Sequence, residues 1–284
     1  MKIAAIVSKP TKPELAEIVP DVLRWLAAHD YRVYIDQQTA AYRTHEFVVP
    51  RTELAHYQPE FVIVLGGDGT LLSAARAIGA TEIPLLAVNL GSLGFLTEVP
   101  LEELYTTLEA VVEGRCPTES RSLLDCRLLR DDREIAHYHA LNDVVVKSTV
   151  ARLIGFAVTI NDDRVMEYQA DGVIVATPTG STAYSLAAGG PVFMPSVEAI
   201  LLTPICPHSL THRPLVVGAG SSITVRLDSG ADGFLSADGQ VGMPVIQGDQ
   251  IVCRKACYQV KLLRVRKSFF DALRSKLRWG QRSG

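Results

Sequence analysis

Residues 62–76, VIVLGGDGTLLSAAR, decide how the first half of the chain folds. A hydrophobic, β-rich run leads into three glycines around one acid, and a helical pattern then continues to Gly79. Glycine lets the backbone turn tightly and lets a ligand approach bare amides. A helix start adds N–H donors and the positive end of the helix dipole. The pattern predicts an anion-binding turn at the carboxyl end of a parallel strand.

The segments around this turn alternate between strand and helix patterns. Hydrophobic runs predict strands over 2–7, 31–35, 61–65 and 84–88, and apolar residues at helical spacing predict helices over 13–29, 71–78 and 101–113. Such alternation is typical of a parallel sheet with helices on its faces. We therefore expect an α/β, Rossmann-like N-terminal domain over residues 1–115.

The pattern changes after residue 115. Short β-rich runs separated by polar turns predict strands over 122–130, 135–141, 143–147, 154–161, 172–176, 222–227, 234–237 and 258–265, with one helical stretch over 181–188. Many short strands of this kind favour an antiparallel sandwich or distorted barrel. We expect an all-β, sandwich-like C-terminal domain over 116–265, followed by a basic helix over 268–278.

Composition and charge limit the class of protein. The chain has 284 residues, 48% of them hydrophobic and 21% charged, which fits two folded domains and excludes disorder. The net charge of −3 gives no overall attraction to nucleic acid or membrane, and neither partner is expected. By segment the net charge is −6 over 1–116, −2 over 117–265 and +5 over 266–284. We expect the basic tail to return to the acidic N-terminal domain, which then comprises 1–115 and 266–284.

Cysteine usage and apolar runs predict the compartment. The five cysteines are an odd number and form no CxxC pair, so neither a disulfide framework nor a cysteine zinc site is expected. No apolar run approaches the roughly 18 residues of a membrane span. We expect a cytoplasmic protein.

The acid in the glycine-rich turn, Asp68, needs an explanation. The turn has neither the lysine of a Walker A loop nor the GxGxxG spacing of a dinucleotide fold. A carboxylate repels phosphate unless it has a task, and it could accept a proton from an attacking hydroxyl or hold a phosphate-bound magnesium ion. The alternative is structural: Asp68 caps its helix through the amides of Thr70 or Leu71.

A second motif, TPTGSTAYSLAAGGP, covers residues 177–191. Four of its residues offer hydroxyls at one strand-to-helix junction, and Tyr184 adds an aromatic face for a purine; the hydroxyl residues are Thr179, Ser181, Thr182 and Ser185. A capped helix start, the plain alternative, needs only one hydroxyl. The surplus favours a ligand site.

A third motif, LNDVVV, covers residues 141–146 and places Asn142 and Asp143 before an apolar strand. An amide beside a carboxylate can hold vicinal ribose hydroxyls or an adenine amine. The alternative is a simple turn, where Asn-Asp is common.

These motifs, in this order, closely resemble the NAD kinases. The resemblance extends over nearly the whole chain and also includes AVNLGSLGFLTE at 87–98, DGVIVA at 171–176 and PICPHSLTHRPLVV at 204–217. GGDGT alone is shared with lipid kinases and phosphofructokinases, whereas TPTGSTAYSLAAGGP is much more specific. The resemblance implies an enzyme that phosphorylates the 2′-hydroxyl of the adenosine ribose of NAD, with ATP as donor, to give NADP.

The resemblance also implies roles for individual residues. Asp68 matches the general base of the family, and an active site between the two domains is expected. The turn facing the donor phosphates would consist of Gly66, Gly67, Gly69 and Thr70. The residues that would bind NAD are Phe95, Asn142, Asp143, Arg152, Gln169, Asp171, Thr179, Thr182, Ala183, Tyr184, Ser185 and Gln240.

Two positions depart from the family pattern. Position 143 is often glutamate, so the reach of Asp143 is one methylene shorter, and Gln169 stands where some relatives carry a basic residue that contacts a diphosphate. Mg²⁺ or another divalent cation is expected to arrive on ATP, without dedicated metal ligands in the protein. A homodimer or homotetramer is implied, because the Asp171 role crosses a subunit interface.

Two other functions fit parts of the sequence. A lipid or sugar kinase would share GGDGT, but no amphipathic membrane helix stands out. A non-catalytic NAD(P)-binding regulator would have no use for an acid beside phosphate. NAD kinase is therefore the favoured prediction.

Overall fold

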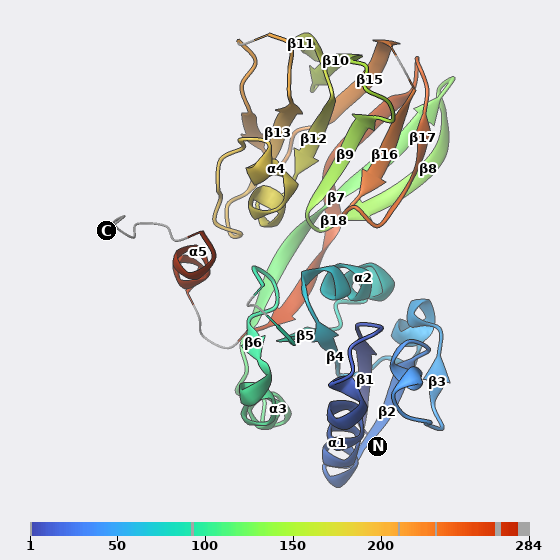
Figure 1. Ribbon diagram of the computed structural model, residues 1–284, viewed down its shortest axis with the longest axis vertical. Coiled ribbons are helices and arrows are strands. Elements are labelled where there is room, and N and C mark those ends of the chain that lie inside the picture. The colour runs from blue at the N-terminus through green and yellow to red at the C-terminus, as the bar shows by residue number, and fades with distance from the viewer. Residues whose placement is uncertain (1, 92–93, 210, 231, 265–267, 278–284) are drawn as a thin grey trace. The chain divides into compact units, whose positions relative to one another are not determined.

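The computed structural model describes residues 2–91, 94–209, 211–230, 232–264 and 268–277 (Figure 1). The chain divides into two compact units. Unit 1 comprises Met1–Ser120 and Val260–Gly284, and unit 2 comprises Arg121–Gln259. The chain passes from one unit to the other inside two long strands, β7 (Thr118–Arg130) and β18 (Gln250–Leu263).

Unit 1 is built on a parallel sheet. Its strands lie in the order β5-β4-β1-β2-β3, with β6 and the end of β18 also paired to β5. All these pairs are parallel, as predicted from the strand–helix alternation. The strand bounds are β1 (Lys2–Ser8), β2 (Tyr31–Asp36), β3 (Val48–Val49), β4 (Phe61–Gly66), β5 (Leu85–Asn89) and β6 (Val99–Pro100).

Unit 1 also contains α-helices. They are α1 (Leu15–Ala28), α2 (Asp68–Ile78), α3 (Leu104–Val112) and α5 (Phe269–Leu277). Helices α1 and α3 share one hydrophobic cluster with alternate sheet residues such as Ile6, Ile63 and Val88. The residues between them along the strands, such as Val7 and Val64, are buried as well. Both faces of the sheet are therefore covered, which explains the nearly continuous apolar strands.

Unit 2 contains two sheets around one core. One sheet has the order β14-β13-β12-β9-β16-β17, and the other runs β11-β10-β15-β18 with β7 and β8 beyond β18. Residues of both sheets, among them Val144, Val175 and Phe156, belong to one buried cluster. The strands not yet bounded are β8 (Arg133–Ala140), β9 (Asp143–Ser148), β10 (Ile154–Ile160), β11 (Asp163–Ala170), β12 (Gly172–Ala176), β13 (Ala199–Ile205), β14 (Leu215–Gly218), β15 (Ile223–Gly230), β16 (Gly233–Ala237) and β17 (Val241–Val245).

Several elements differ from the sequence prediction. Strands β3, β6, β11, β13, β14 and β17 and the first half of β18 were not predicted. Of these, β11, β14 and β17 lie at sheet edges, where polar residues, glycine and proline are tolerated. The helix expected over 181–188 is a 3-10 turn, Thr179–Thr182, followed by the short α4 (Tyr184–Ala187). The helix expected over 101–113 begins with a 3-10 turn and becomes α-helical at Leu104.

The chain returns to unit 1 at the end of β18, and an ion-pair network marks the return. Arg264 donates to both carboxylate oxygens of Glu98, at 3.0 and 2.8 Å, and also to Glu119. Farther on, the Nζ of Lys276 in α5 lies 4.7 Å from the centre of the Phe95 ring. We propose that this C-terminal segment completes the N-terminal domain. The end of the predicted basic helix, Arg278, lies outside the described residues.

Helix α5 gives the first test. Leu273 is 5% exposed, whereas Leu277 on the same helix is 38% exposed. We expect Leu273→Ala to lower the free energy of unfolding by about 2 kcal/mol, because it removes buried methyl groups. The matched Leu277→Ala should change it by less than about 0.5 kcal/mol. Urea unfolding of the full chain measures both; equal effects would argue against a docked helix.

Candidate active site

Asp68 occupies the first turn of α2 but does not cap it. The N-cap residue is Gly67, whose carbonyl accepts the amides of Thr70 at 2.9 Å and Leu71 at 3.2 Å. The carboxylate makes no capping hydrogen bond to either amide. The structural alternative for Asp68, a capping residue for Thr70 or Leu71, is therefore wrong.

The carboxylate of Asp68 is held instead by the segment 95–97. Its Oδ2 accepts the Phe95 amide at 3.0 Å. Its Oδ1 accepts the amides of Leu96 at 3.2 Å and Thr97 at 3.0 Å, and the Thr97 hydroxyl at 3.0 Å. Four donors to one carboxylate fix its position and orientation.

A buried amide side chain supports this arrangement. Asn89, at the end of β5, donates from Nδ2 to Thr97 Oγ1 at 3.1 Å. Because Asn89 supplies that proton, the Thr97 hydroxyl is free to donate its own to Asp68. Asn89 and Thr97 are 6% and 0% exposed, so water does not compete with either bond.

Two glycines make room for these contacts. A Cβ on Gly94 would lie 2.0 Å from Asp68 Oδ1 and 2.1 Å from Thr97 Oγ1. A Cβ on Gly66 would lie 2.3 Å from Thr70 Oγ1. Only glycine fits either position without displacing the turn.

The structure thus brings together most of the residues that were predicted to face the phosphates of the phosphoryl donor. Gly66 ends β4, Gly67 is the N-cap of α2, Gly69 is exposed in the first turn of α2, and Thr70 packs its side chain on Gly66. Phe95 contributes its amide to Asp68 and its ring to Lys276.

Unit 2 contains its own pocket, of about 260 Å³. Four of the predicted nucleoside residues line it: Asn142, Asp143, Ala183 and Tyr184. Tyr184 is 41% exposed, so much of its ring is open to a ligand. The third motif and the centre of the second motif, 40 residues apart in the chain, therefore meet at one pocket.

Asp143 is 5% exposed, and its carboxyl group is close to that of a second acid, Asp238. Burial, with a smaller contribution from the charge of Asp238, raises the pKa of Asp143 to about 7, although a backbone hydrogen bond from Tyr184 opposes the shift. Asp238 accepts the amides of Leu141 at 3.0 Å and Asn142 at 2.7 Å. This acid therefore shapes the turn that carries Asn142 and Asp143.

The sequence analysis missed five residues of this pocket, Val145, Lys147, Ser236, Asp238 and Gly239, of which Lys147, Ser236 and Asp238 have polar or charged side chains. A signal existed for Lys147, because it lies four residues after Asp143 on β9 and so shares its face. Asp238 and Ser236 come from the segment around SADGQ, where the analysis singled out only Gln240.

Most hydroxyl groups of the second motif form hydrogen bonds with other atoms of the protein. Ser185 is buried, and its Oγ lies 2.9 Å from Thr203 Oγ1. Ser181 donates to Pro178 O at 2.6 Å, and Thr182 donates to Thr179 O at 3.2 Å. None of these hydroxyl residues lines the pocket of unit 2.

The second motif also sets the position of Asn142. A Cβ on Gly180 would lie 2.0 Å from the Asn142 carbonyl oxygen, and Thr177 donates to Leu141 O at 2.6 Å. The turn therefore packs directly on the LND backbone.

The remaining predicted contacts lie outside the pocket lining. Arg152, Gln169, Asp171 and Gln240 are all exposed, and Thr179 is buried. Their predicted contacts with NAD stay predictions.

Comparisons with known proteins identify the family. A model described as the ATP-NAD kinase N-terminal domain matches residues 4–116, and one described as the ATP-NAD kinase C-terminal domain matches 141–265. The NAD kinase of Koribacter versatilis (strain Ellin345) is 59% identical over 284 residues, covering 99% of this chain and 100% of that protein. The NAD kinase of Acidobacterium capsulatum is 49% identical with the same coverage.

Two solved structures of kinases resemble the fold of this chain. The crystal structure of yeast NADH kinase complexed with NADH has a TM-score of 0.92 at 28% identity, covering 100% of this chain and 89% of that one. The structure of an NAD kinase from Archaeoglobus fulgidus in complex with ATP has a TM-score of 0.79 at 28% identity, covering 97% and 98%. The fold and the site therefore define a nucleotide-dependent phosphotransferase.

More narrowly, the chain belongs to the NAD kinase family, as its motifs predicted. It is an enzyme of the kinase class. The lipid-kinase and non-catalytic alternatives are set aside by this membership.

The Thr97 hydroxyl gives a test of how Asp68 is held. Thr97→Val keeps the shape of the side chain but removes one hydrogen bond to the carboxylate. Bonds to charged groups contribute about 1.5–3 kcal/mol, so we expect kcat to fall about 10- to 100-fold, with KM for NAD within a few fold. Steady-state kinetics of NADP formation measures both.

A matched control is Thr107→Val in α3, since Thr107 is also buried but donates to Glu103 O at 2.7 Å. It should keep wild-type kcat. An equal loss in both variants would show that Thr97 acts only on stability.

Asp143 gives a pH test. Its pKa of about 7 lies above the unfolded value near 3.9, so the folded protein holds its proton over a wider pH range than the unfolded chain. The contribution of Asp143 to the free energy of unfolding therefore decreases as the pH rises from about 3.9 to about 7. Relative to Asp143→Asn, the wild type should lose up to about 1.4 kcal/mol per pH unit between about pH 5 and pH 7.

Urea unfolding across this pH range measures the difference between wild type and Asp143→Asn. The exposed Asp163→Asn serves as control and should follow the wild-type slope. Parallel curves for wild type and Asp143→Asn would contradict the raised pKa.

Proposed function

We propose that this chain transfers the γ-phosphoryl group of ATP to the 2′-hydroxyl of the adenosine ribose of NAD, with Asp68 as the proton acceptor. Family membership supports the overall reaction, phosphorylation of NAD to NADP. The two solved relatives, complexed with NADH and with ATP, support the two substrates. The observation that carries the mechanism is the fixed carboxylate of Asp68.

The two oxygens of Asp68 differ in what they can still accept. A carboxylate has about four lone-pair sites. From the described residues, Oδ1 accepts three hydrogen bonds, those of Leu96 N, Thr97 N and Thr97 Oγ1, while Oδ2 accepts one, that of the Phe95 amide. Oδ2 is therefore the atom we assign to the ribose hydroxyl proton.

The fixed carboxylate suits phosphoryl transfer, which depends on positioning and charge neutralisation more than on covalent chemistry. In this proposal the ribose hydroxyl donates its proton to Oδ2 while its oxygen attacks the γ-phosphorus, and ADP leaves. A base that need not reorient avoids an entropic cost at that moment.

The pocket of unit 2 supplies the nucleoside half of the proposal. Asn142 and Asp143 would bind polar groups of the adenosine, and the Tyr184 ring would stack on adenine. Lys147 at the same pocket would contribute a positive charge near a substrate phosphate. We keep Gln169, Arg152, Asp171 and Gln240 as proposed contacts to more distant parts of NAD.

The second motif acts mainly through shape in this proposal. Its buried hydroxyl contacts and the close approach of Gly180 to Asn142 fix the turn that carries Ala183 and Tyr184. Thr179, Thr182 and Ser185 would then support the pocket rather than touch the nucleoside.

Mg²⁺ or another divalent cation is proposed to enter as part of the ATP substrate. Mg²⁺ prefers oxygen ligands, retains waters and commonly binds through substrate phosphates. Among the described residues, the one cluster of three metal-type ligands is rich in histidine and lies elsewhere, on β7 and β8. On the phosphates the cation would neutralise the charge of the transferred group.

We further propose a cytoplasmic homodimer or homotetramer. The five cysteines, all free, fit a reducing compartment. Asp171 is exposed and so open to a neighbouring subunit. No helix in the described part of the chain is long and apolar enough to cross a membrane.

Asp68→Asn tests the proton acceptor. Loss of general-base assistance should lower kcat by about 10²- to 10⁴-fold. The assay mixes ATP and NAD and detects product with an NADP-specific dehydrogenase. Asp30→Asn is the control, since Asp30 is an exposed residue of unit 1 whose positive φ of 65° suits asparagine.

The control should keep wild-type turnover and the wild-type unfolding temperature, and Asp68→Asn should remain folded. Wild-type turnover by Asp68→Asn would overturn the assignment of the base. Absence of NADP formation by the wild-type chain would overturn the reaction itself.

A further inference from the structure

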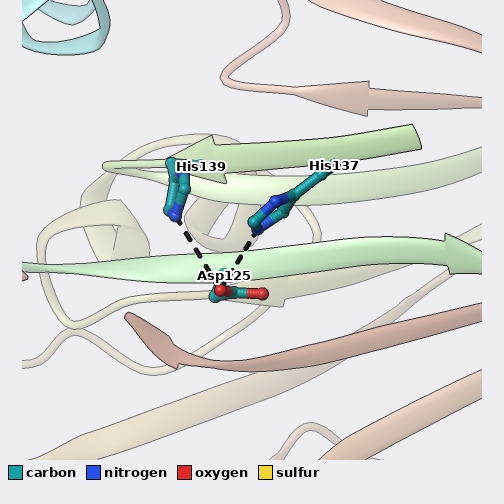
Figure 2. Close-up of side chains that lie close together, drawn as sticks. All are labelled: Asp125, His137 and His139. Carbon is teal, nitrogen blue, oxygen red and sulfur yellow. Dashed lines mark ion pairs between the residues drawn. The ribbon is translucent and has the colours of Figure 1, made fainter. Parts of the chain in front are cut away.

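A group of metal-type ligands lies on the hairpin formed by β7 and β8 in unit 2. Asp125 on β7 is the register partner of His139 on β8, and Arg127 is the partner of His137. Alternate residues of a strand share a face. Figure 2 shows the side chains of Asp125, His137 and His139 converging on one point from the two strands.

A β-bulge produces this convergence. Near the turn Leu129 pairs with Glu134, but the next pair is Leu128 with Ala136, so one residue of β8 is extra. Without the shift Asp125 would face Tyr138, and both histidines would lie on the other face. Bulges commonly re-aim side chains at functional sites.

The distances approach those of a metal centre. Asp125 Oδ2 lies 3.2 Å from His137 Nε2 and 3.8 Å from His139 Nε2. All three ligand atoms lie within 4.8 Å of one another. Metal–ligand bonds of about 2.0–2.1 Å in a tetrahedron place ligand atoms about 3.3 Å apart. Small side-chain rotations therefore complete the geometry.

The second oxygen of Asp125 is already oriented. Arg127 Nε donates to Oδ1 at 3.3 Å, whereas both histidines face Oδ2. Arg127 itself is also bound by Glu134 at 3.3 Å. Such outer contacts hold a metal-binding carboxylate in place. The Tyr258 ring of β18 lies 5.1 Å from that of His139 and restrains the imidazole.

The types of ligand atom at this cluster determine which class of metal ion fits it. Two imidazoles and one carboxylate suit Zn²⁺ and similar transition-metal ions, whereas Mg²⁺ and Ca²⁺ prefer oxygen ligands. The side chains of Asp125, His137 and His139 are 21%, 36% and 29% exposed, so an ion and a water ligand can reach them.

We propose that Asp125, His137 and His139 form a binding site for one divalent transition-metal ion, with Zn²⁺ as the main candidate. The site uses none of the residues that hold Asp68 or line the pocket of unit 2. A bound ion joins β7 to β8 across the hairpin and stabilises unit 2. The proposal stands independently of the phosphoryl-transfer mechanism.

The test uses the full chain after removal of metal with a chelator. Zn²⁺ is titrated against a chromophoric competitor, and Co²⁺ is titrated with its visible absorption as readout. We expect one ion per chain, with affinity at least about 10-fold weaker in His137→Gln and in His139→Gln, since loss of even an outer-shell partner costs that much. Zn²⁺, but not Mg²⁺, should raise the unfolding temperature of the wild type.

The exposed His56, on a 3-10 helix of unit 1, provides the matched control. His56→Gln should bind Zn²⁺ as the wild type does, and all three variants should keep wild-type NADP formation without added zinc, which verifies folding. Absence of stoichiometric binding by the wild type would overturn the site. Equal affinity in His137→Gln, His139→Gln and wild type, as expected if exposed thiols hold the ion, would overturn it as well.

Discussion

The arrangement of unit 1 depends on one constraint: the Asp68 carboxylate must stay in place although it lies in a glycine-rich turn that we propose to bind phosphate. The protein meets this constraint with backbone amides from 95–97 and the Thr97 hydroxyl. The parallel sheet makes the contact possible, because Gly66 at the end of β4 pairs with Asn89 at the end of β5. Residues 94–97 lie against Asp68 at the start of α2, so segments that follow two neighbouring strands meet at the acid.

The two site carboxylates show how environment separates similar groups. Asp68 is half-buried, and hydrogen bonds from the backbone of residues 95–97 and the Thr97 hydroxyl fix its carboxylate. Asp143 is almost fully buried beside another acid, and its pKa of about 7 leaves both protonation states accessible near neutrality. One carboxyl is thus suited to accept a proton, while the other can donate or accept a hydrogen bond to a nucleoside.

Local signals in the sequence were enough to predict much of this. Strand–helix alternation predicted the parallel sheet, and the motifs GGDGT and LND singled out Asp68 and Asp143 as candidate site residues. Contacts between residues that are far apart in the chain could not be predicted from the sequence. Thr97 lies 29 residues from Asp68, and the Asp238 contact with Asn142 spans 96 residues. The hydroxyls at 179–185 were visible, but only the fold shows that Ser181 and Ser185 are used internally.

The hairpin of β7 and β8 makes the same point about register. Its turn residues Asp131 and Asp132 both have positive φ, 50° and 59°, which suits the tight turn of a two-residue hairpin. From the turn alone, a regular ladder would continue and place Asp125 opposite Tyr138. The bulge at Leu128 and Leu129 overrides that register and brings both histidines to Asp125. A one-residue change in register moves every side chain to the opposite face, so no spacing rule along the chain reveals this cluster. Whether a strand carries a site is therefore decided by pairing, which only the folded sheet specifies.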